Sequence, residues 1–230
     1  MTERHRKKLM DAWHYLLALP RSAWLNLRLL PWSQARHMPL LVSHRTRVHY
    51  SSGRLTIEAE KLRIGLVKVG FATYQGSDFR RDRTQLFLHG QLIVEGDCSI
   101  GAGCSIEVGE GARMKIGHDF HLGPKSLVIC HKEIVFGAHN LTSWCCTIMD
   151  TDQHGLADAE NRRVNEDRAV VTGRNVWLGC HVMVPKGVQL ADDTTVAASA
   201  RLTGRYDEPM TVLAGNPAAV VRRGVRRVDL

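Results

Sequence analysis

Aliphatic residues recur every six positions in the second half of the chain, and this spacing restricts the fold more than any other feature of the sequence. Steps of six from residue 172 give the series Thr172, Leu178, Val184, Leu190, Val196 and Leu202. The same frame occurs upstream at 94–106 and 116–134, and again, shifted by two residues, at 136–148. A helix would spread these residues around its circumference, so the period predicts a chain that turns a corner at every sixth residue.

Three edges of this length close one coil of a triangular prism, and stacked coils pair as parallel strands around a buried aliphatic column. We therefore expect a mainly β fold, a parallel β-helix, over residues 55–223, with a loop at 150–170. A small residue follows most aliphatic positions, as Gly179 follows Leu178. We expect it where a corner brings backbones together, often with positive φ. A β-sandwich is the alternative, but its strands would alternate with period two between irregularly spaced turns.

The first 54 residues carry the whole net charge of +8, with ten Lys/Arg against two acidic residues, whereas the rest of the chain has 21 of each sign. We expect residues 1–54 to form a short helical or extended cap. Leu9, Trp13, Leu16 and Leu17 have helical spacing, and Pro20 follows them as a stop. The leucines at 25, 27 and 29 then alternate as they would in a strand.

Two interpretations of this basic cap remain open. Its charge, together with Trp13, Trp24 and Trp32, suits peripheral contact with the anionic inner face of a membrane or with an acidic partner. A solvated amphipathic cap on a neutral domain explains the same pattern. Residues 224–230 form a second, shorter basic segment at the end of the chain.

Composition excludes several classes of protein. Hydrophobic residues make up 44% of the chain and charged residues 23%, which is ordinary for a globular domain and excludes disordered and collagen-like chains. The longest apolar stretch is interrupted by charges and proline and lacks a cleavage site, so we expect a cytoplasmic protein. Six cysteines occur without a CxxC pair, which favours reduced, structural cysteines. The neutral body has no basic stripe, so no nucleic-acid partner is expected.

Three stretches resemble the hexapeptide-repeat, or isoleucine-patch, acyltransferases and in particular their sugar O-acetyltransferase branch. They are GAHNLTSWCCTIMDTDQH from Gly137, VWLGCHVMVPKGVQL from Val176 and AGNPAAVVRR from Ala214. The resemblance covers roughly residues 92–223. It implies a left-handed β-helix, acyl transfer from CoA, as acetyl-CoA, to a hydroxyl or amine, and a homotrimer with sites between subunits. The left hand is implied by the resemblance alone.

The repeat fails between Met149 and Val170, and we expect the chemistry in this loop. Transfer to a hydroxyl requires a base, and histidine suits that task near neutral pH. Alternation in an extended segment predicts that Asp150, Asp152 and His154 share one side, where either carboxylate can orient the imidazole. The motif ending at His154 carries the presumed base in the family that this chain resembles. A metal site formed by the same three residues is an alternative.

The resemblance also implies a donor site. The N–H of Cys180 is expected to stabilise the oxyanion, with Gly179 beside it and Trp177 lining a groove. Direct transfer is favoured over a covalent step at the Cys180 thiol. Ala198 is expected to border the pantetheine arm. Cofactor contacts at the CoA end are expected from Arg205, Asn216, Arg222 and Arg223, although a basic C-terminal tail explains the arginines equally well.

The same sequence also bears on two other functions. A γ-class carbonic anhydrase shares the solenoid, but no two histidines within this solenoid are five residues apart. A non-catalytic trimeric scaffold remains the alternative from another class. The implied acceptor is a sugar or sugar nucleotide, in the synthesis of surface polysaccharides. Arg80, Arg81 and Arg83, in a loop at 76–85, hint at a phosphorylated or acidic acceptor.

Overall fold

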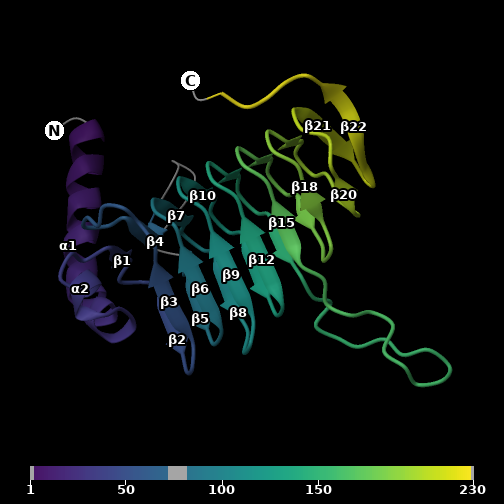
Figure 1. The fold of residues 1–230 in the computed structure, drawn as a ribbon. Coiled ribbons are helices and arrows are strands. Elements are labelled where there is room, and N and C mark those ends of the chain that lie inside the picture. The colour runs from purple at the N-terminus through teal and green to yellow at the C-terminus, as the bar shows by residue number, and fades with distance from the viewer. Residues whose placement is uncertain (1–2, 72–81, 229–230) are drawn as a thin grey trace.

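Three parallel β-sheets wind around one axis in the computed structural model, which describes residues 3–71 and 82–228 (Figure 1). In spatial order, sheet A contains β1 (Leu40–Val42), β4 (Val67–Phe71), β7 (Cys98–Gly101), β10 (Phe120–Leu122), β13 (Leu141–Thr142), β16 (Trp177–Leu178), β19 (Thr195–Val196), β21 (Thr211–Gly215) and β22 (Ala218–Arg223). Sheet B contains β17 (Met183–Val184), β14 (Thr147–Met149), β11 (Leu127–Cys130), β8 (Ser105–Val108), β5 (Gln85–Leu88) and β2 (Arg47–Tyr50). Sheet C contains β20 (Arg205–Tyr206), β18 (Gln189–Leu190), β15 (Val170–Thr172), β12 (Glu133–Phe136), β9 (Arg113–Ile116), β6 (Gln91–Val94) and β3 (Arg54–Ile57).

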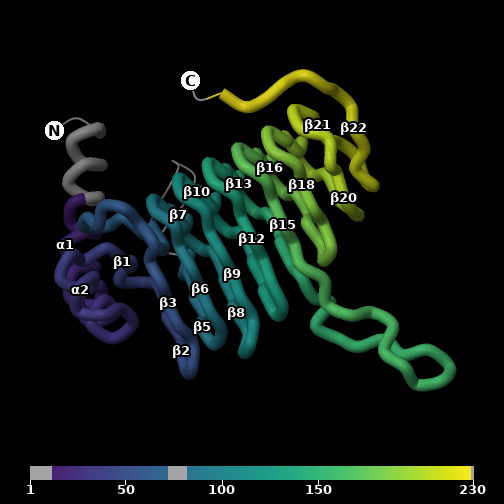
Figure 2. Tube along the Cα trace, in the orientation of Figure 1, coloured from purple at the N-terminus to yellow at the C-terminus, as the bar shows by residue number. Residues whose placement is uncertain are grey.

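The chain visits the three sheets in turn, so each circuit of A, B and C makes one coil of a solenoid (Figures 1 and 2). Neighbouring coils pair in parallel, as Leu178 of β16 does with Thr142 on one side and Val196 on the other. Antiparallel pairing among the named strands occurs between β21 and β22, where a hairpin ends the solenoid. The expected fold class, a mainly β, parallel β-helix with an N-terminal cap, is confirmed.

The period-six residues form the predicted column. Every member of the series from Thr172 to Leu202 is buried, and so are the residues of the upstream frame. They face one another across the inside of the prism. Burying them there stabilises the fold by about 25 cal/mol for each Å² of apolar surface removed from water. The period-six aliphatic of each edge therefore defines the core, together with a second buried residue two positions before it, such as Val176, Val182 or Val188.

The small residues beside this column are explained by close approach rather than by backbone conformation. A Cβ on Gly123 would lie 2.4 Å from the carbonyl carbon of Ser143, and one on Gly137 would lie 2.3 Å from the Gly173 oxygen. Neither glycine has positive φ. Positive φ occurs two residues later, at corner residues such as Lys125 and His139. The expectation of close packing was correct, and the expectation of positive φ at the small residue was wrong.

Helix α1 spans Glu3–Leu29, so the predictions of a helix stop at Pro20 and of a strand near residue 27 were wrong. Pro20 lies inside the helix, which continues because its next turns are held by contacts with β1. Ala18, Ser22 and Leu25 are buried at helical spacing, and this packing outweighs the local cost of the proline. A short second helix, α2 (Trp32–Ala35), follows.

The solenoid begins near Leu40, upstream of the boundary expected at residue 55, because β1 already pairs with β4 and β2 with β5. At the other end, the chain after β22 runs back along earlier coils (Figure 1). The Nδ2 group of Asn175 donates to the Arg227 carbonyl at 3.3 Å, and the Arg227 guanidinium donates to the His139 carbonyl at 2.9 Å. Neither helix in the described part of the chain is both long and apolar enough to cross a membrane.

Candidate functional site

A long loop leaves the solenoid between β14 and β15 and projects away from it (Figures 1 and 2). Its base is held by Asp152, Asn165 and Lys186. The Lys186 Nζ atom lies 2.5 Å from a carboxylate oxygen of Asp152 and donates to the Asn165 carbonyl at 2.8 Å. The Asn165 side chain donates in turn to the Asp152 carboxylate and to the His154 carbonyl, both at 2.8 Å. The loop base is therefore fixed to the next coil.

Asp152 is an ionised member of this network. The hydrogen bond from Lys186, followed by that from Asn165, lowers the pKa of the Asp152 carboxyl below its ordinary value. Its interactions are with these two side chains, and its link to the His154 segment runs through Asn165. Asp152 therefore positions the loop rather than contacting the imidazole. Sequence reasoning missed Asn165 and Lys186, because a period-six pattern carries no information about contacts between a loop and a neighbouring coil.

Asp150 does not share a side with Asp152 and His154, in contrast to the expectation from alternation. Its side chain is fully buried, and its two oxygens accept the backbone N–H groups of His131 and Lys132 at 2.7 and 2.8 Å. In addition, Gln153 has a φ of 60°, which breaks the extended geometry between Asp152 and His154 on which alternation depends. Asp150 thus closes the corner between β11 and β12 and is not in contact with His154.

Replacing Asp150 by alanine is expected to destabilise the fold by about 1–3 kcal/mol, because two backbone donors lose their acceptor. The Asp150→Asn variant keeps one carbonyl oxygen and is expected to lose less. Urea unfolding followed by circular dichroism measures both differences. An Asp150→Ala midpoint equal to that of the unsubstituted protein would contradict this structural role.

His154 is exposed in the loop, four residues after Asp150, the buried corner residue that follows β14. The segment around it is held through its backbone, because its carbonyl accepts from Asn165. No hydrogen bond joins its ring to another residue within 3–71 or 82–228. The arrangement presents an accessible imidazole on an anchored backbone, which is what a general base requires.

Trp177, Gly179, Cys180 and Ala198 lie together at the corner where sheet A turns into sheet B. The Gly179 N–H donates to the Val196 carbonyl at 2.8 Å, and the Cys180 carbonyl accepts from the backbone N–H of Ser199 at the same distance. A Cβ on Gly179 would come within 2.7 Å of the Ala198 nitrogen, so the two coils touch here. Trp177 is 38% exposed on the same sheet, with its indole N–H 3.3 Å from Ser143 Oγ. The structure therefore brings these four predicted residues together.

The backbone N–H of Cys180 is not used by the solenoid. It donates no hydrogen bond among the described residues. Strand register makes Pro124, which follows β10, the counterpart of Cys180 two coils away. Proline has no N–H, so this corner position does not need a donor for the fold. The amide at Cys180 is therefore available to an outside acceptor, such as a developing oxyanion.

All six cysteines are free thiols, as expected. Burial raises the pKa of the Cys98 and Cys104 thiols to about 12 and that of Cys146 to about 11. Burial and the charge of Asp150 also raise the pKa of Cys130. These four side chains are inert small hydrophobes. Cys145 and Cys180 are half-buried at corners.

The predicted contacts at the CoA end are distributed over different faces. Asn216 lies in the β21–β22 hairpin beside the Ala198 corner, because the backbone N–H of Arg201 donates to the Gly215 carbonyl at 3.0 Å. Arg205 is on sheet C, where it pairs with Asp207. Arg222 and Arg223 are on β22 opposite the start of β21, and Arg223 pairs with Glu208. The structure thus places Asn216 with the corner residues and does not bring the three arginines there.

His154 and Cys180 are not brought together within one chain. The loop leaves at the corner between sheets B and C, whereas Cys180 lies at the corner between sheets A and B of the next coil. The strands of sheet B separate these two edges of the prism. Arg80 and Arg81, the residues of the expected basic acceptor loop, lie outside the described part of the chain, and Arg83 is exposed.

The fold defines a class: a three-sided solenoid of hexapeptide repeats, interrupted by one long histidine-bearing loop within the described residues. No protein-family model matches the chain. Galactoside O-acetyltransferase of Escherichia coli (strain K12) is 24% identical over 135 residues, covering 57% of this chain and 66% of that protein. A Klebsiella pneumoniae relative, described as an uncharacterized 24.8 kDa protein in cps region, is 26% identical over 136 residues, covering 59% of this chain and 60% of its own length.

A solved structure shares the fold. The crystal structure of the polySia-specific acetyltransferase NeuO matches with a TM-score of 0.57 at 16% identity, covering 81% of this chain and 90% of that chain. The matched segments span less than two thirds of either sequence relative. Together the comparisons confirm the resemblance to hexapeptide-repeat acetyltransferases that the motifs predicted.

Proposed function

We propose that this protein transfers an acetyl group from acetyl-CoA to a hydroxyl of a sugar-type acceptor. One observation carries the proposal: an exposed imidazole, that of His154, stands on a loop whose base Lys186 and Asn165 fix to the solenoid. A second observation supports it. The Cys180 corner offers an amide that the fold does not use, in a motif that resembles the acyl-donor site of the family.

His154 and the Cys180 corner have different roles in the proposed acyl transfer. Acetyl-CoA supplies the activated acyl group as its thioester. The His154 ring accepts the acceptor's hydroxyl proton as the oxygen attacks the thioester carbonyl, and then returns a proton to the departing thiolate. The Cys180 N–H donates to the carbonyl oxygen as negative charge develops there. Trp177 flanks this position and lines the groove. No covalent step at the Cys180 sulfur is needed.

We propose further that the active form is a homotrimer with the site between subunits. Support comes from the separation of His154 and Cys180 on different edges of the prism. Side-by-side packing of prisms can bring the loop of one subunit against the corner of the next. The exposed side chains of Leu156 and Val164 in the loop are apolar, which suits such a contact.

The acceptor belongs to the sugars or sugar nucleotides of surface polysaccharide synthesis in this proposal. Similarity to a galactoside O-acetyltransferase and a fold shared with a polySia-specific acetyltransferase both support a carbohydrate acceptor. Six free thiols suit a reducing compartment, so we place the activity in the cytoplasm.

Thiol release from acetyl-CoA tests the function directly. The purified chain is incubated with acetyl-CoA and a panel of free sugars, oligosaccharides, amino sugars and sugar nucleotides. We expect release that depends on one class of acceptor and a product whose mass is increased by one acetyl group. Tight binding of a sugar in calorimetry without any thiol release would instead identify a non-catalytic scaffold.

A further inference from the structure

The side of α1 that faces solvent is its apolar side. Trp13, Leu16, Trp24 and Leu27 are 54–59% exposed, and Leu17 is 40% exposed. At 100° per residue these five side chains, together with Pro20, fall within one stripe about a third of the circumference wide. A solvated surface helix normally turns such a stripe toward the core. Here the stripe points away from it, so it requires a partner.

Polar contacts on the opposite side prevent α1 from turning this stripe inward. The hydroxyl of Ser22 accepts the Val42 N–H at 2.9 Å, and the Asn26 side chain both donates to and accepts from the backbone of Leu40, at 2.6 and 3.1 Å. Ser22 and Asn26 are fully buried. These bonds satisfy the edge of β1 and fix the rotation of the helix, because rolling it would leave buried polar groups unpaired.

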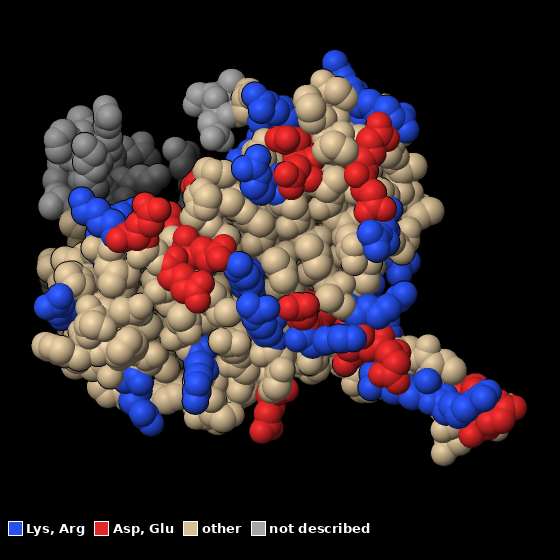
Figure 3. Space-filling view, in the orientation of Figure 1, with Lys and Arg blue, Asp and Glu red and all other residues tan. Residues whose placement is uncertain are grey.

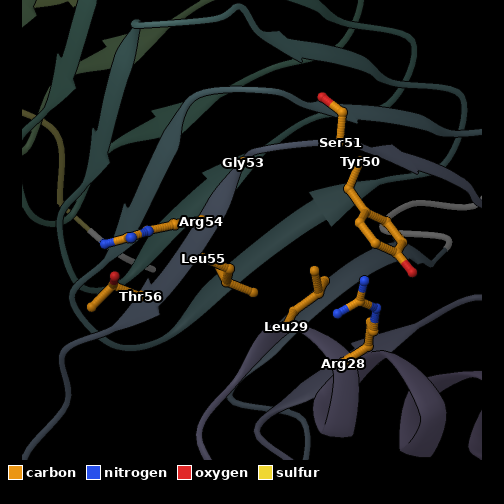
Figure 4. A pocket seen from close by; sticks show the side chains of 8 residues that line it. All are labelled: Arg28, Leu29, Tyr50, Ser51, Gly53, Arg54, Leu55 and Thr56. Atoms are coloured by element: carbon orange, nitrogen blue, oxygen red, sulfur yellow. The ribbon is translucent and has the colours of Figure 1, made fainter.

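A basic pocket adjoins the end of the stripe. It has a volume of about 300 Å³ and lies between the last turn of α1 and strands β2 and β3. Figure 4 shows Arg28 and Tyr50 on one side of it, Arg54 and Thr56 on the other, and the Ser51 hydroxyl nearby. The Arg28 guanidinium lies 5.5 Å from the centre of the Tyr50 ring, and Trp24 packs at 6.2 Å from the same ring. Neither arginine pairs with an acid among the described residues.

We propose that this face of α1 docks on a bilayer surface that contains anionic lipid, with lipid phosphates beside Arg28 and beside Arg54. Tryptophan and leucine bury in the headgroup boundary, where tryptophan is favoured, and flanking arginines attract the anionic surface. Figure 1 shows α1 lying across the end of the solenoid, and Figure 3 shows mainly uncharged surface at that end, with scattered cations and some acidic groups around it. The solenoid would then stand on the membrane by this end.

Charge favours a lipid surface over a second copy of the chain. The segment 1–54 has a net charge of +8, so two such faces brought together would repel each other. An anionic bilayer provides both the apolar layer that the stripe requires and the opposite charge. The inference is independent of the proposed acetyl transfer, which a soluble acceptor tests without membranes.

Co-sedimentation with vesicles tests this docking. We expect the full chain to sediment with vesicles of phosphatidylcholine containing phosphatidylglycerol, and to remain in solution with phosphatidylcholine alone. The Leu16→Gln/Leu27→Gln variant is expected to lower the partition coefficient at least ~10-fold, and Arg28→Gln/Arg54→Gln about 10-fold at low salt. The tryptophan emission of the unsubstituted chain is expected to shift to the blue on binding.

Matched controls separate the face from general surface properties. Val221→Gln removes an equally exposed apolar side chain from β22, and Arg113→Gln/Arg162→Gln removes the same charge from β9 and from the loop between β14 and β15. Both controls are expected to bind vesicles like the unsubstituted chain, and all variants should keep its circular dichroism spectrum. Failure to sediment with either vesicle overturns the proposal. So does a loss of self-association in Leu16→Gln/Leu27→Gln, in light scattering, without vesicle binding, because the face would then be an interface between copies.

Discussion

Replacing His154 by alanine is expected to lower kcat by ~10²–10⁴ and to leave the fold intact. The imidazole is exposed, and no described residue hydrogen-bonds to its ring, so its removal creates no cavity and unpairs no polar group. The loop keeps its position because Asn165 holds the backbone of residue 154 rather than its ring. Thiol release at saturating acetyl-CoA measures the loss, and the thermal unfolding midpoint checks the fold.

His37 provides the control for this variant, because it is also exposed but lies far along the chain, after α2. His37→Ala is expected to retain full activity. Near-normal turnover by His154→Ala would remove this residue from the mechanism. A loss confined to KM would give it a role in acceptor binding instead of proton transfer.

The Cys180→Pro variant is expected to lower kcat by ~10²–10³, because it deletes the backbone N–H that we assign to the oxyanion. Pro124 already occupies the equivalent corner of another coil, so the solenoid should accept the substitution. Cys180→Ala keeps the N–H and removes only the thiol, and we expect it to remain active. Loss of activity in Cys180→Ala, with an acetylated thiol found in the unsubstituted protein, would establish covalent catalysis instead.

The His154→Ala and Cys180→Pro variants together test whether the site lies within one subunit or between two. His154 and Cys180 lie on different edges of one prism, so a site between subunits takes one residue from each. Co-expressed His154→Ala and Cys180→Pro chains should then form mixed oligomers that contain some intact sites, and activity should return. Mixing after separate purification, without subunit exchange, should restore none. Absence of recovery in proven mixed oligomers would place both residues in one subunit.

Much of the fold could be predicted because the core of a solenoid repeats along the sequence. An aliphatic residue recurs at the same buried position of every edge, so a local pattern indicates the tertiary structure. The cap has no such repetition. Its helix continues through Pro20 because Ser22 and Asn26 bind β1, and these contacts join residues up to 20 positions apart. A prediction from local propensity therefore ends the helix too early.

The candidate site could likewise be predicted only in part. The break in the repeat identified the loop and His154, and the motif identified the corner of Gly179 and Cys180. Alternation failed at Asp150, since the residue serves a buried corner before the loop begins. The partnership of Asp152 with Lys186 depends on where the next coil passes. Arg222 and Arg223 lie away from the corner because β22 folds back on β21, which the period cannot show.

The returning C-terminal segment has a mechanical consequence. In a stack of coils each layer contacts only its neighbours, so an end layer can fray without disturbing the others. Arg227 contacts two earlier coils at once, since its carbonyl accepts from the Asn175 side chain and its guanidinium donates to the carbonyl of residue 139. The segment acts as a strap across successive layers, and the terminal layers must loosen together rather than one at a time. The corner at Cys180 and Ala198 is thereby kept rigid although it lies close to the end of the stack.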